Sequence, residues 1–76
     1  MREADKMFEE LDYVKEENEK AIIYKYDHEL IGMRMVWDIT FWKPSEMIFF
    51  HTINGLDKKT LEAINTKYKE LGWFDE

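Results

Sequence analysis

The longest regular pattern in this sequence is an alternation of apolar residues over positions 31–41. Every odd-numbered residue in this stretch is apolar, whereas Arg34 and Asp38 occupy even-numbered positions. Side chains of a β-strand point alternately to its two faces, so the alternation predicts a strand with one buried and one wetter face. A helix would place both charged residues on the apolar stripe. The chain must therefore build a sheet.

Other strands are predicted on both sides of this one. Residues 21–26 are rich in β-branched and aromatic side chains, and residues 13–15 form a possible short strand before them. Asp27-His28-Glu29 is interpreted as a polar tight connection, and residues 43–46, which include the only proline, as the next turn.

Residues 47–53 predict a further strand, which is apolar on both faces except at His51 and Thr52. Strands that are covered on both sides show such continuous apolar runs. This segment is therefore expected to be the central strand, or a strand with a layer on each side.

The N-terminal segment predicts a helix. Ala4, Met7, Phe8 and Leu11 recur at the spacing of one helical face. Asp12 is a plausible end for this helix, because aspartate adopts the left-handed conformation better than most residues with a side chain.

The C-terminal segment predicts a second helix, with Asp57 as its N-cap and Gly72 as its stop. The residues that follow the two predicted helices align with one another, so we expect the same capping arrangement at both ends. Four side chains are expected to line the buried face of this helix: Leu61, Ile64, Tyr68 and Leu71.

Together these segments predict a single α+β domain over residues 1–76. Its three- or four-stranded antiparallel sheet is packed against an N-terminal and a C-terminal helix. We expect both helices on one face of the sheet. The second face, with Trp42 and either Phe49 or Phe50, is then left for a partner or for a second copy of the chain.

Charge and composition exclude several classes of function. The net charge is −6, and residues 1–29 hold ten acidic against five basic residues. Lys58-Lys59 is the only basic pair, so direct nucleic-acid binding and binding to anionic membranes are disfavoured. No apolar run resembles a signal peptide or a membrane span, and cysteine is absent. A cytoplasmic protein without a cofactor or metal is expected.

Three segments carry a resemblance to a known group: residues 4–11, residues 22–24, and residues 61–64 continued through 70–73. They resemble short uncharacterised proteins encoded by phages and prophages of Gram-positive bacteria. Asp12 departs from the glycine that this group tends to have. The resemblance implies a bacterial host cell but no catalytic or binding residue.

Histidine and aspartate are weak candidates for chemistry here. His28 lies between two acidic residues, but adjacent residues on a tight turn diverge, so a solvated turn is favoured over a metal site. His51 is interpreted as a hydrogen-bonded histidine near a sheet end, or as a pH-sensitive group at an interface. Asp38 has no second carboxylate, nucleophile or base at a useful spacing. A small enzyme is therefore the least favoured reading.

Twelve aromatic residues exceed what a 76-residue core needs, so some are expected on a surface that binds protein. The leading hypothesis is a non-enzymatic, protein-binding accessory protein that is plausibly a homodimer. The alternative is that the aromatic residues only fill the core. The candidate partner-binding residues are Arg34, Val36, Trp42, Ile48 and Phe50.

The second hypothesis is an acidic inhibitor that imitates nucleic acid or docks on a basic host protein. Its candidate acidic surface consists of Glu9, Glu10, Glu16, Glu17 and Glu19. A solvated helix face is the simpler interpretation of this acidic segment.

Overall fold

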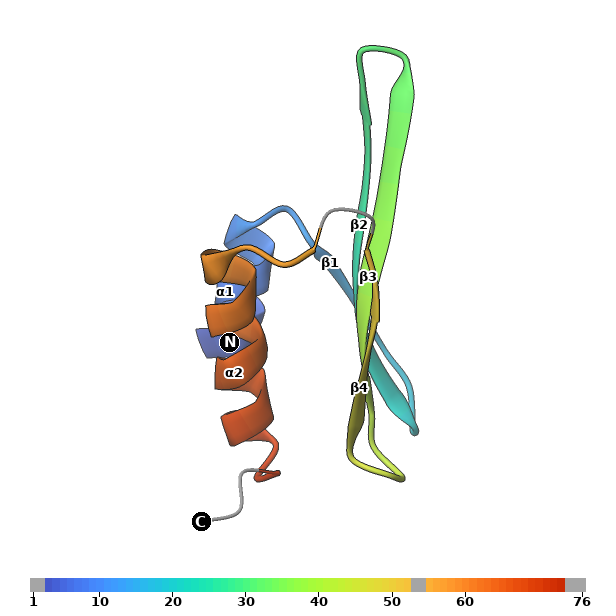
Figure 1. The fold of residues 1–76 in the computed structure, drawn as a ribbon. Coiled ribbons are helices and arrows are strands. Elements are labelled where there is room, and N and C mark those ends of the chain that lie inside the picture. The colour runs from blue at the N-terminus through green and yellow to red at the C-terminus, as the bar shows by residue number, and fades with distance from the viewer. Residues whose placement is uncertain (1–2, 53–54, 74–76) are drawn as a thin grey trace.

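The computed structural model of the chain describes residues 3–52 and 55–73 (Figure 1). Its elements follow in the order α1 (Glu3–Glu10), β1 (Val14–Glu17), β2 (Ala21–Leu30), β3 (Met33–Trp42), β4 (Met47–His51) and α2 (Lys58–Glu70). The predicted α+β class is confirmed, and the short segment after the first helix is a true fourth strand.

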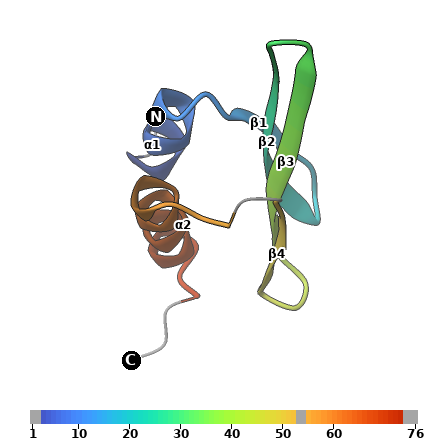
Figure 2. The same ribbon diagram turned by 45° about the horizontal axis from the view of Figure 1, so that its top comes forward.

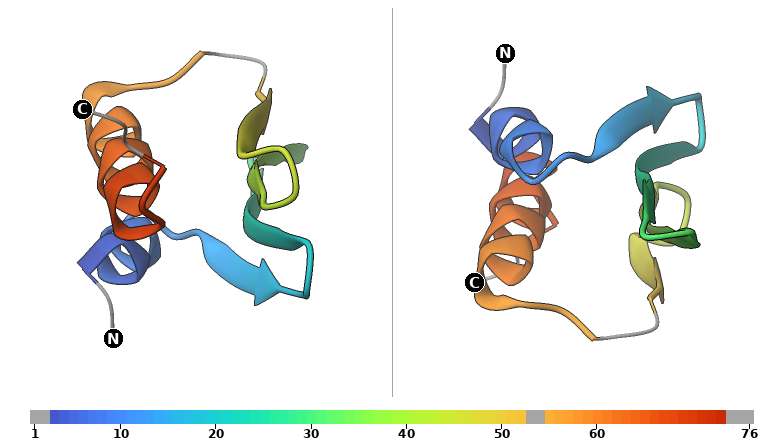
Figure 3. Two further views of the ribbon diagram at one scale, coloured as in Figure 1. Left: turned by 90° about the horizontal axis from the view of Figure 1, so that it is seen from below. Right: turned by 90° about the horizontal axis from the view of Figure 1, so that it is seen from above.

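The four strands form one antiparallel sheet, in which each strand pairs with its neighbour in the sequence. Figures 1 and 3 show both helices on one side of this sheet, as the sequence predicts. We call this side the helix face and the other side the open face. Because side chains alternate along a strand, the pairing register assigns each strand residue to one of the two faces.

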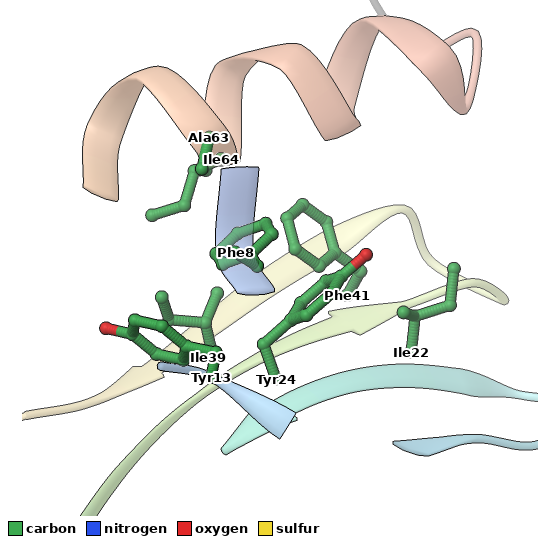
Figure 4. Close-up of a cluster of buried hydrophobic side chains, with 8 residues drawn as sticks. All are labelled: Phe8, Tyr13, Ile22, Tyr24, Ile39, Phe41, Ala63 and Ile64. Atoms are coloured by element: carbon green, nitrogen blue, oxygen red, sulfur yellow. The ribbon is translucent and has the colours of Figure 1, made fainter. Parts of the chain in front are cut away.

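The hydrophobic core lies between the helix face and the two helices (Figure 4). Phe8 of α1 stacks on Tyr24 of β2 with ring centroids 3.8 Å apart, and the edge of Phe41 meets both rings. Phe8, Tyr24, Phe41 and Ile39 are almost completely buried. The alternation in residues 31–41 therefore places its odd-numbered side chains on the helix face, and the last of them form the core.

The helix α1 ends as predicted. Asp12 adopts the left-handed conformation with φ of 68°, and the Tyr13 N–H donates to the Phe8 carbonyl at 3.0 Å. This bond closes a Schellman turn, which satisfies a carbonyl that the helix leaves free. The Tyr13 ring folds back onto Phe8 in an edge-to-face contact, with centroids 5.5 Å apart.

The helix α2 is capped at both of its ends, and its C-terminal cap repeats the one that follows α1. At its N-terminus, the Asp57 carboxylate accepts a hydrogen bond from the Thr60 N–H at 2.8 Å, so Asp57 is the N-cap. At the other end, Gly72 has φ of 74°, and the Trp73 N–H donates to the Tyr68 carbonyl at 3.3 Å. The prediction that the two helices share one capping motif at their C-terminal ends is confirmed.

The buried face of α2 differs from the predicted one at Leu61, which is 49% exposed. Thr60, Ala63, Ile64 and Lys67 are the buried residues of this helix. Lys67 occupies an inner position because a carboxylate of α1 meets its ammonium group there, which the pattern of apolar residues does not reveal.

The hairpin between β2 and β3 turns later than predicted. Asp27-His28-Glu29 belongs to β2, so its interpretation as a connection is wrong. The strands instead join through Ile31 and Gly32, with φ of 52° and 75°. A two-residue hairpin turn requires such positive φ values, and isoleucine is an unusual residue for that position.

The strand β4 lies at an edge of the sheet, so its prediction as a central or doubly covered strand is wrong. It pairs only with β3, and Met47, Phe49 and Phe50 are each about half exposed. Burial within the single chain therefore accounts for only part of the apolar composition of this strand.

Candidate functional site

The β2–β3 hairpin extends beyond the rest of the sheet as a two-stranded arm. The pairing with β1 stops at Lys25 of β2, and the pairing with β4 stops at Asp38 of β3. Residues 26–37 therefore pair only within the hairpin, and we call them the arm. Figures 1 and 2 show the arm rising past the helices. The arm accounts for the elongated shape of the protein, which measures 44 × 23 × 22 Å.

Aromatic contacts anchor the base of the arm on the helix face. Tyr26 and Trp37 stack face to face with centroids 4.2 Å apart, and His28 lies 4.2 Å from the Tyr26 ring. The Trp37 indole N–H donates to the Tyr13 hydroxyl at 3.0 Å. Isolated two-stranded hairpins are marginal in water, so these contacts hold the arm in a defined direction.

A charged pair supports the arm on the open face. The Arg34 guanidinium donates two hydrogen bonds to the Asp27 carboxylate, at 2.9 and 2.6 Å. These bonds lower the pKa of the Asp27 carboxyl group, so the pair remains charged at neutral pH. Arg34 therefore has a structural role, because it links the two strands of the arm.

Exposed apolar side chains gather on the arm and on β4. Eight large hydrophobic residues of the described chain are exposed, and six of them lie in these two places. Those six are Ile31, Met33, Val36, Met47, Phe49 and Phe50. Contiguous exposed apolar patches mark surfaces that bind other molecules, so these six residues are candidates for such a surface.

The pairing register divides the predicted partner-binding residues between two faces. Arg34, Val36 and Trp42 all lie on the open face, with Arg34 and Val36 in the arm and Trp42 at the other end of β3. Ile48 and Phe50 lie on the helix face, because Ile48 pairs with Phe41 and Phe50 with the core residue Ile39. The structure therefore does not bring these five candidates onto one surface.

Met47 and Phe49 take the places on the open face that were expected for Ile48 and Phe50. Met47 pairs with Trp42, and Phe49 pairs with Thr40. The length of the turn between β3 and β4 could have predicted this register from the sequence. A four-residue turn over 43–46 pairs Trp42 with Met47 and so fixes which side chains of β4 share its face.

The candidate acidic residues are dispersed. Glu9 and Glu10 are exposed on α1, Glu19 is exposed in the turn after β1, and the pairing register puts Glu16 and Glu17 on opposite faces. Lys25 pairs with Glu16 at 2.9 Å, and Lys43 pairs with Glu17 at 3.0 Å. No continuous negative surface joins these five side chains within the described residues.

A polar cluster joins the two helices to β1. Asp5 accepts hydrogen bonds from the Tyr24 hydroxyl at 2.5 Å and from the Lys15 ammonium at 2.9 Å, and Lys67 lies 3.4 Å away. Burial alone would raise the pKa of Asp5, but these partners outweigh it and hold the pKa below its ordinary value. The Glu70 carboxylate accepts a bond from the Ala4 N–H at 2.9 Å.

This cluster has a structural role, because it holds α1 against α2. Lys67 is 5% exposed, and a buried ammonium group needs a carboxylate close by. Burial, and the hydrogen bond to Asp5, raise the pKa of Tyr24, so its hydroxyl remains a donor at all ordinary pH values. The sequence does not reveal this cluster, because its members lie far apart along the chain.

A cavity of about 270 Å³ lies at the base of the arm, between β3 and the start of α2. Its polar lining groups are already bonded to one another. Tyr13 accepts from Trp37, and the Asp57 carboxylate accepts from the Thr60 N–H. Burial raises the pKa of the Tyr13 hydroxyl, which keeps it protonated at neutral pH. The cavity is smaller than typical ligand sites, which occupy roughly 300–1,000 Å³.

The two histidines have separate environments. The His28 Nε2 lies 3.4 Å from the Asp12 carbonyl, and His51 lies on the open face with its Nδ1 3.9 Å from an Asp38 carboxylate oxygen. Over residues 3–52 and 55–73, no three histidine, aspartate or glutamate side chains are grouped to hold a metal ion. In the same residues, neither helix is long and apolar enough to cross a membrane.

Comparisons of the chain with protein-family models, with curated proteins and with solved structures find no match. The fold and the arrangement of side chains are therefore the basis for a functional proposal.

Proposed function

We propose that this chain is a non-enzymatic protein-binding protein, and that the arm carries its contact with the partner. The observation that carries the proposal is the apex residue of the arm. Ile31 is 102% exposed, and it adopts φ of 52° in the turn. An apolar side chain in this position contributes nothing to the core of its own protein.

The conformation of Ile31 also costs stability. The left-handed region costs a residue with a Cβ roughly 1–2 kcal/mol, and a β-branched side chain fits it poorly. Asn-Gly is the preferred pair for a two-residue turn of this kind. An isoleucine here is unfavourable for the isolated fold, whereas a partner with an apolar pocket would recover the cost on binding.

The surroundings of the apex favour a protein partner. Met33, 70% exposed on the helix face, and Val36, 51% exposed on the open face, add apolar surface to both sides of the arm. The net charge of −6 and the acidic N-terminal half oppose binding to phosphate backbones and anionic membranes. A phage or prophage origin and a cytoplasmic location, which rest on the resemblance and on the composition, stay predictions.

The substitution Ile31→Asn tests the proposal, because it separates binding from stability. It should raise the free energy of unfolding by about 1 kcal/mol, since Asn-Gly suits the turn. It should also lower partner capture at least roughly tenfold, as expected for the loss of an apolar anchor. Stability is measured by urea denaturation, and capture with the immobilised variant as bait in bacterial lysates.

Leu61→Asn is the matched control, because Leu61 is an exposed apolar residue on α2, away from the arm. This variant should capture the same proteins as the wild type. Equal capture by wild-type and Ile31→Asn baits would contradict a role for the arm apex.

A further inference from the structure

The free edge of β4 lacks the features that protect edge strands. Residues 47–51 contain no proline, lysine, arginine or acidic residue, and Met47, Phe49 and Phe50 are half exposed. Natural sheets protect their edges with charges, proline or bulges, because an open strand edge pairs readily with another strand. The composition of β4 is that of a strand with a partner.

The phase of hydrogen bonding identifies the backbone groups at this edge. The Lys43 N–H donates to the Lys20 carbonyl at 2.8 Å, so odd-numbered residues of the β3 stretch direct their backbone groups toward β2. Even-numbered residues of β3 therefore face β4 and pair with its odd-numbered residues. The N–H and C=O groups of Ile48 and Phe50 are left pointing away from the sheet.

We infer that the partner of β4 is the β4 strand of a second copy of this chain, paired antiparallel about a two-fold axis at Phe49. In this register Ile48 of each chain lies opposite Phe50 of the other. Each of these two pairs exchanges two backbone hydrogen bonds, which satisfies all four outward-pointing groups of each chain. No other two-fold register pairs all five residues of the strand.

The side chains suit this register. Phe49 of each copy meets its own equivalent at the axis, in a pair without backbone hydrogen bonds, where side chains approach most closely. Met47 lies opposite His51, and Ile48 lies opposite Phe50. Apart from His51, the contact is apolar, and β4 itself contains no acidic residue, although the chain carries a net charge of −6.

The area indicates a weak, concentration-dependent dimer. Phe49 and Phe50 are about half exposed, so the two rings offer roughly 200 Å² per chain, and Met47 adds about half as much again. The two chains together would bury about 600 Å² of these side chains, plus the backbone edges. This falls in the range of transient complexes, below about 1,200 Å².

The dimer would have one continuous eight-stranded sheet. A two-fold axis perpendicular to the sheet keeps the helices of both copies on the same face and merges the two open faces. The two arms would project in opposite directions. This interface is separate from the arm apex. The dimer can therefore be refuted without refuting the proposed partner contact, and the reverse also holds.

A charge at the two-fold axis gives the first test. Phe49→Lys places two ammonium groups against each other, and light scattering after size exclusion should give the monomer mass at every concentration. The wild type should shift from monomer toward dimer as its concentration rises. Val14→Lys is the matched control, since Val14 is an exposed open-face residue on the opposite edge strand, and it should dimerise like the wild type.

Charge complementation sharpens this test. Phe49→Glu alone should also be monomeric, whereas a mixture of Phe49→Glu and Phe49→Lys should associate, because opposite charges then meet at the axis. Circular dichroism verifies that each variant is folded. A wild type that is monomeric at the highest concentration, or a Phe49→Lys variant that dimerises like the wild type, would overturn the inference.

Amide exchange locates the interface directly. The Ile48 and Phe50 amide protons should exchange more slowly as the protein concentration rises, while the other amides of β4 should not change. Phe50→Pro removes one of these donors, and Phe50→Ala retains it, so the proline variant should dimerise at least several-fold more weakly than the alanine variant. Dimerisation that leaves both amides unprotected would place the interface elsewhere and refute the β4 pairing.

Discussion

The two edge strands of the sheet are attached to the body by opposite kinds of chemistry. On β1, Lys15 and Glu17 point to the helix face and form ion pairs with Asp5 and Lys43. On β4, the equivalent positions hold Ile48 and an aromatic residue, which lie opposite core residues. One edge is held by charges, whereas the other is held by apolar contact.

This difference between β1 and β4 affects how readily each edge of the sheet can pair with another strand. Charged side chains on β1 discourage the addition of another strand, because pairing would desolvate them. The edge of β4 has no such deterrent. The chain therefore has one charged edge and one apolar edge, and the proposed pairing through β4 alone would stop at two copies.

The largest expected effect comes from breaking the charged attachment at Asp5. Asp5→Ala removes the carboxylate that the buried Lys67 contacts, and it also releases Lys15 and the Tyr24 hydroxyl. Loss of one member of a buried ion pair costs about 3 kcal/mol. Urea denaturation should show this loss in the free energy of unfolding, whereas Glu9→Ala on the exposed side of α1 should change it by less than about 0.5 kcal/mol.

The apolar attachment at Ile48 should give the next largest effect. Ile48 is half buried against the core, so Ile48→Ala should cost about 2 kcal/mol, the low end for truncation of an isoleucine. High salt should leave this loss unchanged, because no charge is involved. A cost that disappears in high salt would show that β4 is not held by apolar contact.

Acid should weaken the β1 side selectively. The pKa of Asp5 in the folded protein lies below its ordinary value of 3.8, so its contribution is complete above that pH and is lost as the pH falls through the folded value. The stability difference between the wild type and Asp5→Asn should therefore be constant near neutrality and shrink below pH 3.8. Thermal melts across this range measure it, and Ile48→Ala should keep a constant difference.

The smallest effect is expected at the exposed pair between Lys43 and Glu17. The Lys43 ammonium holds the pKa of the Glu17 carboxyl group below its usual value, but both side chains are about one-third to one-half exposed. Lys43→Ala should cost less than about 1 kcal/mol at low salt. The cost should vanish in high salt, where surface charges are screened. A salt-independent cost would point to packing of the lysine stem instead.

The sequence predicted local structure well, because local structure follows from adjacent residues. The stops at Asp12 and Gly72 and the N-cap at Asp57 are each set by the conformational preference of one residue. The position of the hairpin turn was missed for the same reason. Ile31 occupies a turn position that its own preference disfavours, and the polar residues before it were the stronger turn signal.

The candidate surface was predicted only in part, because it depends on pairing between strands. Trp42 and Val36 were placed on the open face correctly, but Ile48 and Phe50 required the register across the turn at 43–46. The edge position of β4 was missed because an apolar strand is usually covered by its own chain. Lys67 was missed because its partner is 62 residues away.

The sequential order of the strands also bears on how the chain folds. Every strand pairs with its sequence neighbour, so the sheet forms through short loops with little loss of chain entropy. Among the described residues, α1 and α2 join the two ends of the chain through Asp5 with Lys67 and through Ala4 with Glu70. We therefore expect the strand pairs to be formed in the folding transition state, and the contacts between the two helices to form after it. Substitutions at Asp5 should accelerate unfolding while leaving the refolding rate almost unchanged.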